Sequence, residues 1–85
     1  MLYRIYTENK NQPEIEKIAG KFFDGFTVIK SKGFWRLQGE NSLILEIEAP
    51  DVEKEKVEEL AKAIKEANAQ ESVLIQELKN SSWLV

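Results

Sequence analysis

The chain has 85 residues, 42% of them hydrophobic and 32% charged, with a formal net charge of -3. This length suits one domain over residues 1–85, and the acidic balance argues against nonspecific binding of nucleic acid. Cys and His are both missing, which excludes disulfides, thiolate metal sites and the commonest general base. Charged side chains interrupt the first twenty residues, and no apolar run approaches the roughly 20 residues of a membrane span. We therefore expect a cytoplasmic protein that does not associate with membranes.

The first part of the chain predicts a strand followed by a helix. Residues 2–7 are aromatic and β-branched, which is typical of a strand. A polar loop follows, and Pro13 marks the start of a helix. The helix is predicted over 13–23, because its apolar residues follow the i, i+3, i+4, i+7 spacing of one helical face: Ile15, Ile18, Ala19 and Phe22.

A second strand is expected in two pieces. Residues 26–29 open it, and residues 34–37 resume it after a bulge or sharp bend at Gly33. The polar residues 38–41 are then predicted to form the turn that leads to the next strand.

The second half predicts a strand, a helix and a last strand. Residues 42–49 alternate between apolar and polar side chains, which favours a strand with one solvated face. A helix is predicted over 52–68 after Pro50, and a final strand over 72–78. Three apolar residues, Trp83, Leu84 and Val85, follow.

The resulting order, βαββαβ, predicts an α+β ferredoxin-like sandwich with two helices on one face of a four-stranded antiparallel sheet. Nine apolar side chains are expected in its core: Ile15, Ile18, Phe22, Leu43, Leu45, Ile47, Val57, Leu60 and Ile64. The opposite face, which we call the open face, is expected to carry both charged and apolar residues: Leu2, Arg4, Tyr6, Ile44, Glu46 and Glu48.

The hairpin around Gly33 is the most distinctive local feature, because it is basic and aromatic within an acidic chain. Its candidate ligand- or partner-binding residues are Lys32, Trp35, Arg36 and Glu40. A flat ring, a planar cation and an acceptor suit a nucleoside-like ligand. The structural alternative is that Trp35 packs into the core while Arg36 and Glu40 pair weakly at the surface.

The remaining polar residues do not predict a catalytic centre. Glu46 and Glu48 share one face of a strand, and such a pair could bind a cation or carry raised pKa values, whereas a solvated face balanced by Arg4 explains them as well. Neither a phosphate-binding loop nor a serine–base–acid arrangement is identifiable. We therefore predict no catalytic residue, no cofactor and no metal ligand.

We expect the chain to self-associate, because a monomer of 85 residues would leave a large apolar surface exposed to water. The predicted interface comprises residues of the open face and of the chain end: Leu2, Arg4, Tyr6, Ile44, Glu46, Trp83 and Leu84. The apolar chain end has two alternatives, since it can fold back over its own sheet or dock on a neighbouring subunit.

Several short patterns resemble small uncharacterised proteins that phages, plasmids and prokaryotic genomes carry. The patterns are an aspartate–glycine turn, a glycine–x–aromatic step, a glutamate two residues before a serine, and a late strand: Asp24-Gly25, Gly33-Phe34-Trp35, Glu40-Asn41-Ser42 and Ser72-Val73-Leu74. The same order resembles, more weakly, phage S-adenosylmethionine lyases. That resemblance implies a ferredoxin-like trimer with active sites between subunits, and it draws attention to Trp35 and Glu40. This chain is much shorter and lacks the C-terminal extension of those enzymes.

Our main hypothesis is a non-enzymatic cytoplasmic module that forms a homo-oligomer through its sheet face or edge strands and binds a partner or small ligand. The rival hypothesis is a small oligomeric enzyme or nucleoside-binding protein. Its pocket would lie at a subunit boundary and be lined by Trp35, Arg36 and Glu40. Buried charged groups with strongly perturbed pKa values would favour this rival hypothesis over the main one.

Overall fold

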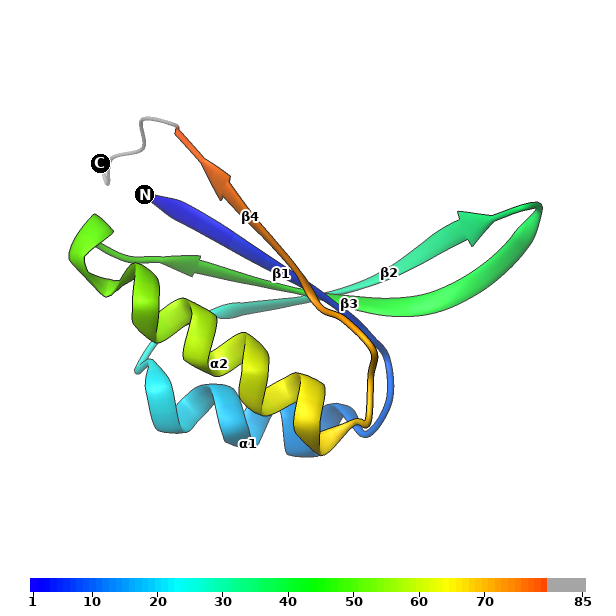
Figure 1. Cartoon of the computed structure of the whole chain (residues 1–85), viewed down its shortest axis with the longest axis horizontal. Helices are drawn as coiled ribbons and strands as arrows, with labels where there is room; N and C mark the ends of the chain where they lie inside the picture. Colours follow the sequence, from blue (N-terminus) through cyan, green and yellow to red (C-terminus); the bar gives the residue numbers. More distant parts are fainter. Residues whose placement is uncertain (80–85) are drawn as a thin grey trace.

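The structure, a computed structural model, describes residues 1–79. Its elements are β1 (Leu2–Glu8), α1 (Gln12–Phe22), β2 (Thr27–Trp35), β3 (Gln38–Glu48), a 3-10 turn (Asp51–Glu53), α2 (Lys54–Ala67) and β4 (Leu74–Leu78). The strands form one antiparallel sheet in the order β2-β3-β1-β4. Both helices cover the same face of it (Figure 1). The predicted ferredoxin-like α+β fold is confirmed.

The core lies between this sheet and the two helices. Odd-numbered residues of β1 and β3 point toward the helices, which gives both strands an alternating pattern of burial. The largest fully buried side chains come from β1, β3 and both helices: Tyr3, Ile5, Ile15, Leu43, Leu45, Ile47, Val57, Leu60 and Ile64. The predicted register of β3 is therefore confirmed.

One predicted core residue is wrong. Phe22 is only partly buried, whereas the neighbouring Phe23 is buried at 8% exposure. The helix ends at Phe22, and Phe23 has an extended backbone. This change of backbone turns the side chain of Phe23, rather than that of Phe22, into the core.

The hairpin between β2 and β3 also differs from the prediction. Gly33 is paired regularly with Glu40, so β2 continues through the expected bulge. The turn is formed by Arg36 and Leu37, with φ angles of 50° and 65°. Positive φ at both central residues is the geometry of a two-residue type I′ turn. The predicted turn over 38–41 is instead the start of β3.

Gly39 is the reason that the sequence analysis placed the turn at residues 38–41. A Cβ atom at this position would lie 2.5 Å from Cε of Lys32, which crosses the ribbon there. The glycine therefore provides space for a long side chain within a strand and does not reverse the chain.

Beyond β1, the hairpin becomes a two-stranded ribbon without other cover among the described residues. The last pair between β1 and β3 joins Glu8 to Ser42. Residues 32–41, which we call the arm, continue past this point and away from the helices (Figure 1). On the arm, the side chain of Phe34 is 71% exposed and that of Leu37 is 99% exposed.

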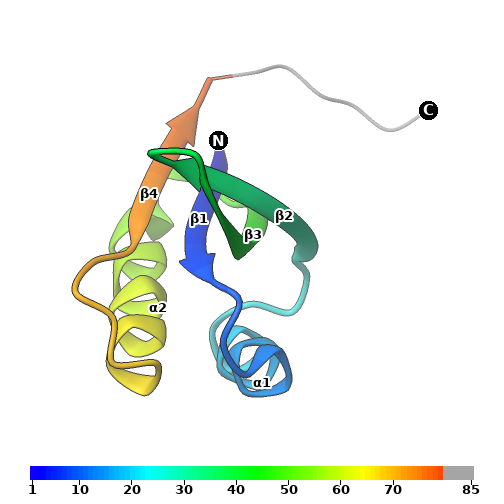
Figure 2. The ribbon, with the colours of Figure 1, turned by 90° about the vertical axis from the view of Figure 1, so that its right-hand side faces the viewer.

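Figure 2 shows how the helices divide the sheet between them, with α2 beneath β4 and α1 toward β2. Neither helix in the 1–79 range has the length and apolar character needed to cross a membrane. The predicted interface residues Trp83 and Leu84 lie outside the described residues.

Candidate functional site

The open face of the sheet carries an apolar row that crosses all four strands. The ladders place Ile29 opposite Ile44, Ile44 opposite Tyr6, and Tyr6 opposite Leu74. Strands lie about 4.8 Å apart, so four aligned side chains span about 14 Å. Leu74 is 60% exposed and Ile29 38% exposed, and both helices lie on the other side of the sheet. We call these four residues the apolar row.

A polar row runs beside it, one pleat along the strands. Nε of Arg4 donates a hydrogen bond to Oε2 of Glu46 at 2.8 Å, and Glu46 raises the pKa of the Arg4 guanidinium. The hydroxyl of Tyr6 donates to Oε1 of Gln76 at 2.8 Å, which ties the apolar row to the polar row. These contacts hold the side chains in a fixed pattern on the face.

The two glutamates considered as a cation site each have their own cation. Glu46 is paired with Arg4, and Oε1 of Glu48 lies 3.1 Å from the amino group of Met1. Across residues 1–79, the structure contains no group of three or more acidic side chains that could hold a metal ion. The pair therefore forms part of a charge-balanced surface.

The structure thus brings five predicted interface residues onto one face: Leu2, Arg4, Tyr6, Ile44 and Glu46. It also adds residues that the sequence analysis did not include. Ile29 and Leu74 extend the apolar row to both edges, and Leu78 lies opposite Leu2. Their strands were predicted, but their neighbours across the sheet depend on strand order and register.

The candidate residues of the arm are distributed over the ribbon. Lys32 lies over the ring of Phe34, with Nζ 5.5 Å from the ring centroid. Glu40 is opposite Gly33, so the alternation of the ladder places Glu40 and Lys32 on different faces of the ribbon. Arg36 lies in the turn, and the backbone of Trp35 is paired with Gln38. The arm therefore groups Lys32 with Phe34 and separates both from Glu40.

A groove between α2 and β4 is a further feature that the sequence did not reveal. One part is lined by residues of both elements and the loop between them: Glu58, Ala61, Lys62, Lys65, Ser72, Val73 and Ile75. An adjoining part contains Tyr3, Lys54 and Glu77. Nζ of Lys54 lies 2.6 Å from Oε1 of Glu77, and burial raises the pKa of the Tyr3 phenol.

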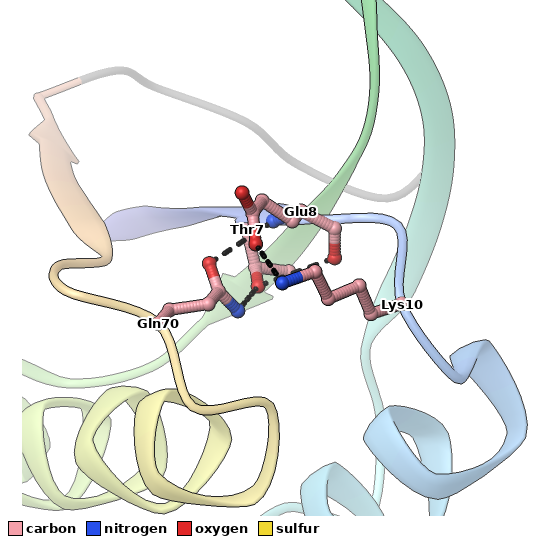
Figure 3. Close-up of polar contacts among 4 residues, drawn as sticks. All are labelled: Thr7, Glu8, Lys10 and Gln70. Atoms are coloured by element: carbon pink, nitrogen blue, oxygen red, sulfur yellow. Dashed lines mark hydrogen bonds and ion pairs between the residues drawn. The ribbon is translucent and has the colours of Figure 1, made fainter.

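A polar junction joins the far end of β1 to the loop after α2 (Figure 3). Nε2 of Gln70 donates to Oγ1 of Thr7 at 2.5 Å, while the backbone N–H of Glu8 donates to Oε1 of Gln70 at 3.2 Å. Thr7 is 3% exposed, and Lys10 pairs with Glu8 at the outer side of the junction. The Thr7 hydroxyl also donates to the backbone carbonyl of Glu8 at 3.4 Å, so the contacts of the junction connect β1 to the loop after α2.

Comparison with known proteins gives similarity of structure alone. No protein-family model and no curated protein sequence matches the chain. A DUF3240 family protein from Shewanella baltica OS155 superposes with a TM-score of 0.67 at 18% identity, covering 99% of this chain and 94% of that one. The GlnK–ATP complex of B. subtilis superposes with a TM-score of 0.55 at 17% identity, covering 94% and 85%. Both support the ferredoxin-like fold, and the first is a small protein of an uncharacterised family.

Proposed function

We propose that this protein is a non-enzymatic cytoplasmic module that self-associates through the open face of its sheet. The observation that carries the proposal is the apolar row of Ile29, Ile44, Tyr6 and Leu74. An exposed apolar stripe bounded by polar residues is typical of a protein–protein contact.

The polar row would determine how two copies align. Most homo-oligomers are symmetric, so the same patch serves both subunits and must be complementary to itself. Arg4 and Glu46 already neutralise one another at 2.8 Å. A face of this kind can be covered by a second copy without burying an unpaired charge, which would be costly.

The test is the mass of the protein in solution. Ile44→Lys and Ile29→Lys place a cation in the apolar row, whereas Val52→Lys is a matched control on a residue that is 90% exposed in the turn before α2. Sedimentation at micromolar concentration should show a larger oligomer for wild type and for Val52→Lys than for the two row variants, all measured against the 9.8 kDa mass of one chain. A wild-type protein that is entirely monomeric would contradict the proposal.

A second function, binding of a nucleotide-type ligand at the arm, has narrower support. The arm offers a cation over an aromatic ring at Lys32 and Phe34, and one structural neighbour is a complex with ATP. Titration calorimetry with ATP tests this function in wild type, Lys32→Ala and Phe34→Ala, with Lys62→Ala as a control on α2. Binding that is lost in the two arm variants and kept in the control supports it, and equal affinity in all four proteins rejects it.

A further inference from the structure

Within residues 1–79, the outer edge of β4 carries backbone N–H and C=O groups that are not paired with another strand. The N–H of Asn9 donates to the carbonyl of Asn41, and that of Ala49 donates to the carbonyl of Met1. Odd-numbered residues of β1 therefore bond to β3, and even-numbered residues bond to β4. By the same alternation, Leu74, Gln76 and Leu78 bond to β1. The N–H and C=O groups of Ile75 and Glu77 then point away from the sheet.

The two edges of the sheet differ in whether they admit another strand. On β2, a two-fold pairing about Ser31 would place Lys30 opposite Lys32 of the second copy, and both lysines are at least partly exposed on this strand. Lysine on an edge strand is a recognised means of preventing such pairing. The five residues of β4 include no lysine. Among the described residues, the β4 edge is therefore more open than the β2 edge to a strand of the same sequence.

We propose that β4 pairs antiparallel with β4 of a second copy, about a two-fold axis at Gln76. This register is the one in which all five residues of Leu74–Leu78 find partners. Ile75 then exchanges backbone hydrogen bonds with Glu77 of the second copy, and Gln76 lies opposite its own equivalent. An axis at Glu77 would instead bring two glutamates together.

The pairing makes the apolar rows of the two open faces continuous. Leu74, which ends the row of one copy, becomes the neighbour of Leu78 of the second copy. Leu78 is itself opposite Leu2. Two uninterrupted apolar rows then cross the joined sheet, each formed by four side chains of one copy and two of the other.

Charges on the helix side are complementary in the same register. Lys54 is bonded to Glu77, whereas Glu58 lines the groove beside Ile75. In this register, Ile75 lies opposite Glu77 of the second copy. Glu58 of one copy therefore lies at the same height along the paired strands as Lys54 of the other copy. The groove between α2 and β4 is therefore bounded by opposite charges across the axis.

This inference rests on the proposed self-association, and it adds an edge contact to the face contact. Since the chain has no cysteine, Gln76→Cys introduces a single thiol at the axis. Residues opposed in a non-hydrogen-bonded pair have Cα atoms about 4.5 Å apart, within the roughly 4.4–6.8 Å that a disulfide needs. Ser31→Cys, in the middle of β2, is the matched control.

Mild oxidation of the full chain, followed by non-reducing electrophoresis, should convert most Gln76→Cys protein to a covalent dimer and little of Ser31→Cys. Circular dichroism establishes that both variants are folded. A Gln76→Cys protein that is folded and oligomeric yet does not cross-link would overturn the edge pairing while leaving the proposed function intact.

The background variant Ile44→Lys separates the two contacts. Gln76→Cys combined with Ile44→Lys should still cross-link, because the substituted residue lies on β3 and away from the β4 edge. A wild-type monomer in which the amides of Ile75 and Glu77 exchange slowly would show that this edge is covered within a single chain. That result would overturn both proposals.

Discussion

Nε of Arg4 lies 2.8 Å from Oε2 of Glu46, and the two residues are direct partners in the β1–β3 ladder. Their side chains are 36% and 22% exposed, so the pair is partly removed from water on a sheet face that both helices leave open. Because its two charges are opposite, this pair adds no net charge to the open face. The pair lies directly beside the apolar row and borders it on one side.

The first prediction concerns the strength of this pair. A double-mutant cycle with Arg4→Met and Glu46→Gln should give a small favourable coupling free energy that decreases as salt is added, because solvent screens a partly exposed pair. Chemical denaturation measures it. The more exposed pair of Lys10 and Glu8 is the control and should couple less. An equal coupling in both pairs would remove any special role for Arg4.

The second prediction concerns the junction of Thr7 and Gln70. Gln70→Ala removes two hydrogen bonds and leaves the buried Thr7 hydroxyl without this partner, so the free energy of unfolding should fall by about 1–3 kcal/mol. Gln12→Ala is the control, since the Gln12 amide bonds to Glu16 on an exposed helix surface. Equal losses in the two variants would show that the junction contributes nothing beyond a surface contact.

The third prediction concerns the turn of the arm. Arg36 and Leu37 both have positive φ, which costs residues other than glycine about 1–3 kcal/mol each. Replacing the pair by Asn-Gly, the preferred type I′ sequence, should raise the melting temperature. Val52→Gly, at an exposed residue, controls for glycine's flexibility and should lower it. A lower melting temperature for the Asn-Gly variant would mean that contacts of Arg36 outweigh the strain.

The fourth prediction is a loss of stability at high pH. Burial, followed by the nearby carboxylates of Asp51 and Glu77, raises the pKa of Tyr3 above its ordinary value of 10.0. An acid whose pKa is higher in the folded state keeps its contribution below the unfolded pKa and loses it as the pH rises through the folded one. The denaturation midpoint should therefore fall above about pH 10. This fall should be smaller in Tyr3→Phe than in wild type.

Much of the fold follows from periodicity in the sequence. The alternation over residues 42–49 correctly predicted that Leu43, Leu45 and Ile47 face the core. The spacing in the second helix likewise predicted Val57 and Leu60. Such patterns are reliable because each of these elements has one buried face, and a shift by one residue would exchange the faces.

The arm and the junction could not be predicted in the same way. Arg36 and Leu37 have no preference for a turn, whereas Gly39 suggests one but serves to accommodate Lys32. The bond between Thr7 and Gln70 joins residues 63 positions apart, and nothing local in either segment indicates it. The apolar row, similarly, depends on the order of four strands rather than on the pattern of any one of them.

The short ladder of β4 has a consequence for the shelf life of the protein. β4 is held by five pairs to β1, between segments such as Tyr6 and Gln76 that are 70 residues apart in the chain, whereas β2 and β3 are joined by a local hairpin. Local unfolding should therefore begin with β4. Once β4 separates, β1 becomes a bare edge of aromatic and β-branched residues, which is a template for aggregation. The rate at which β4 detaches would then limit how long a concentrated solution of the protein remains free of aggregates.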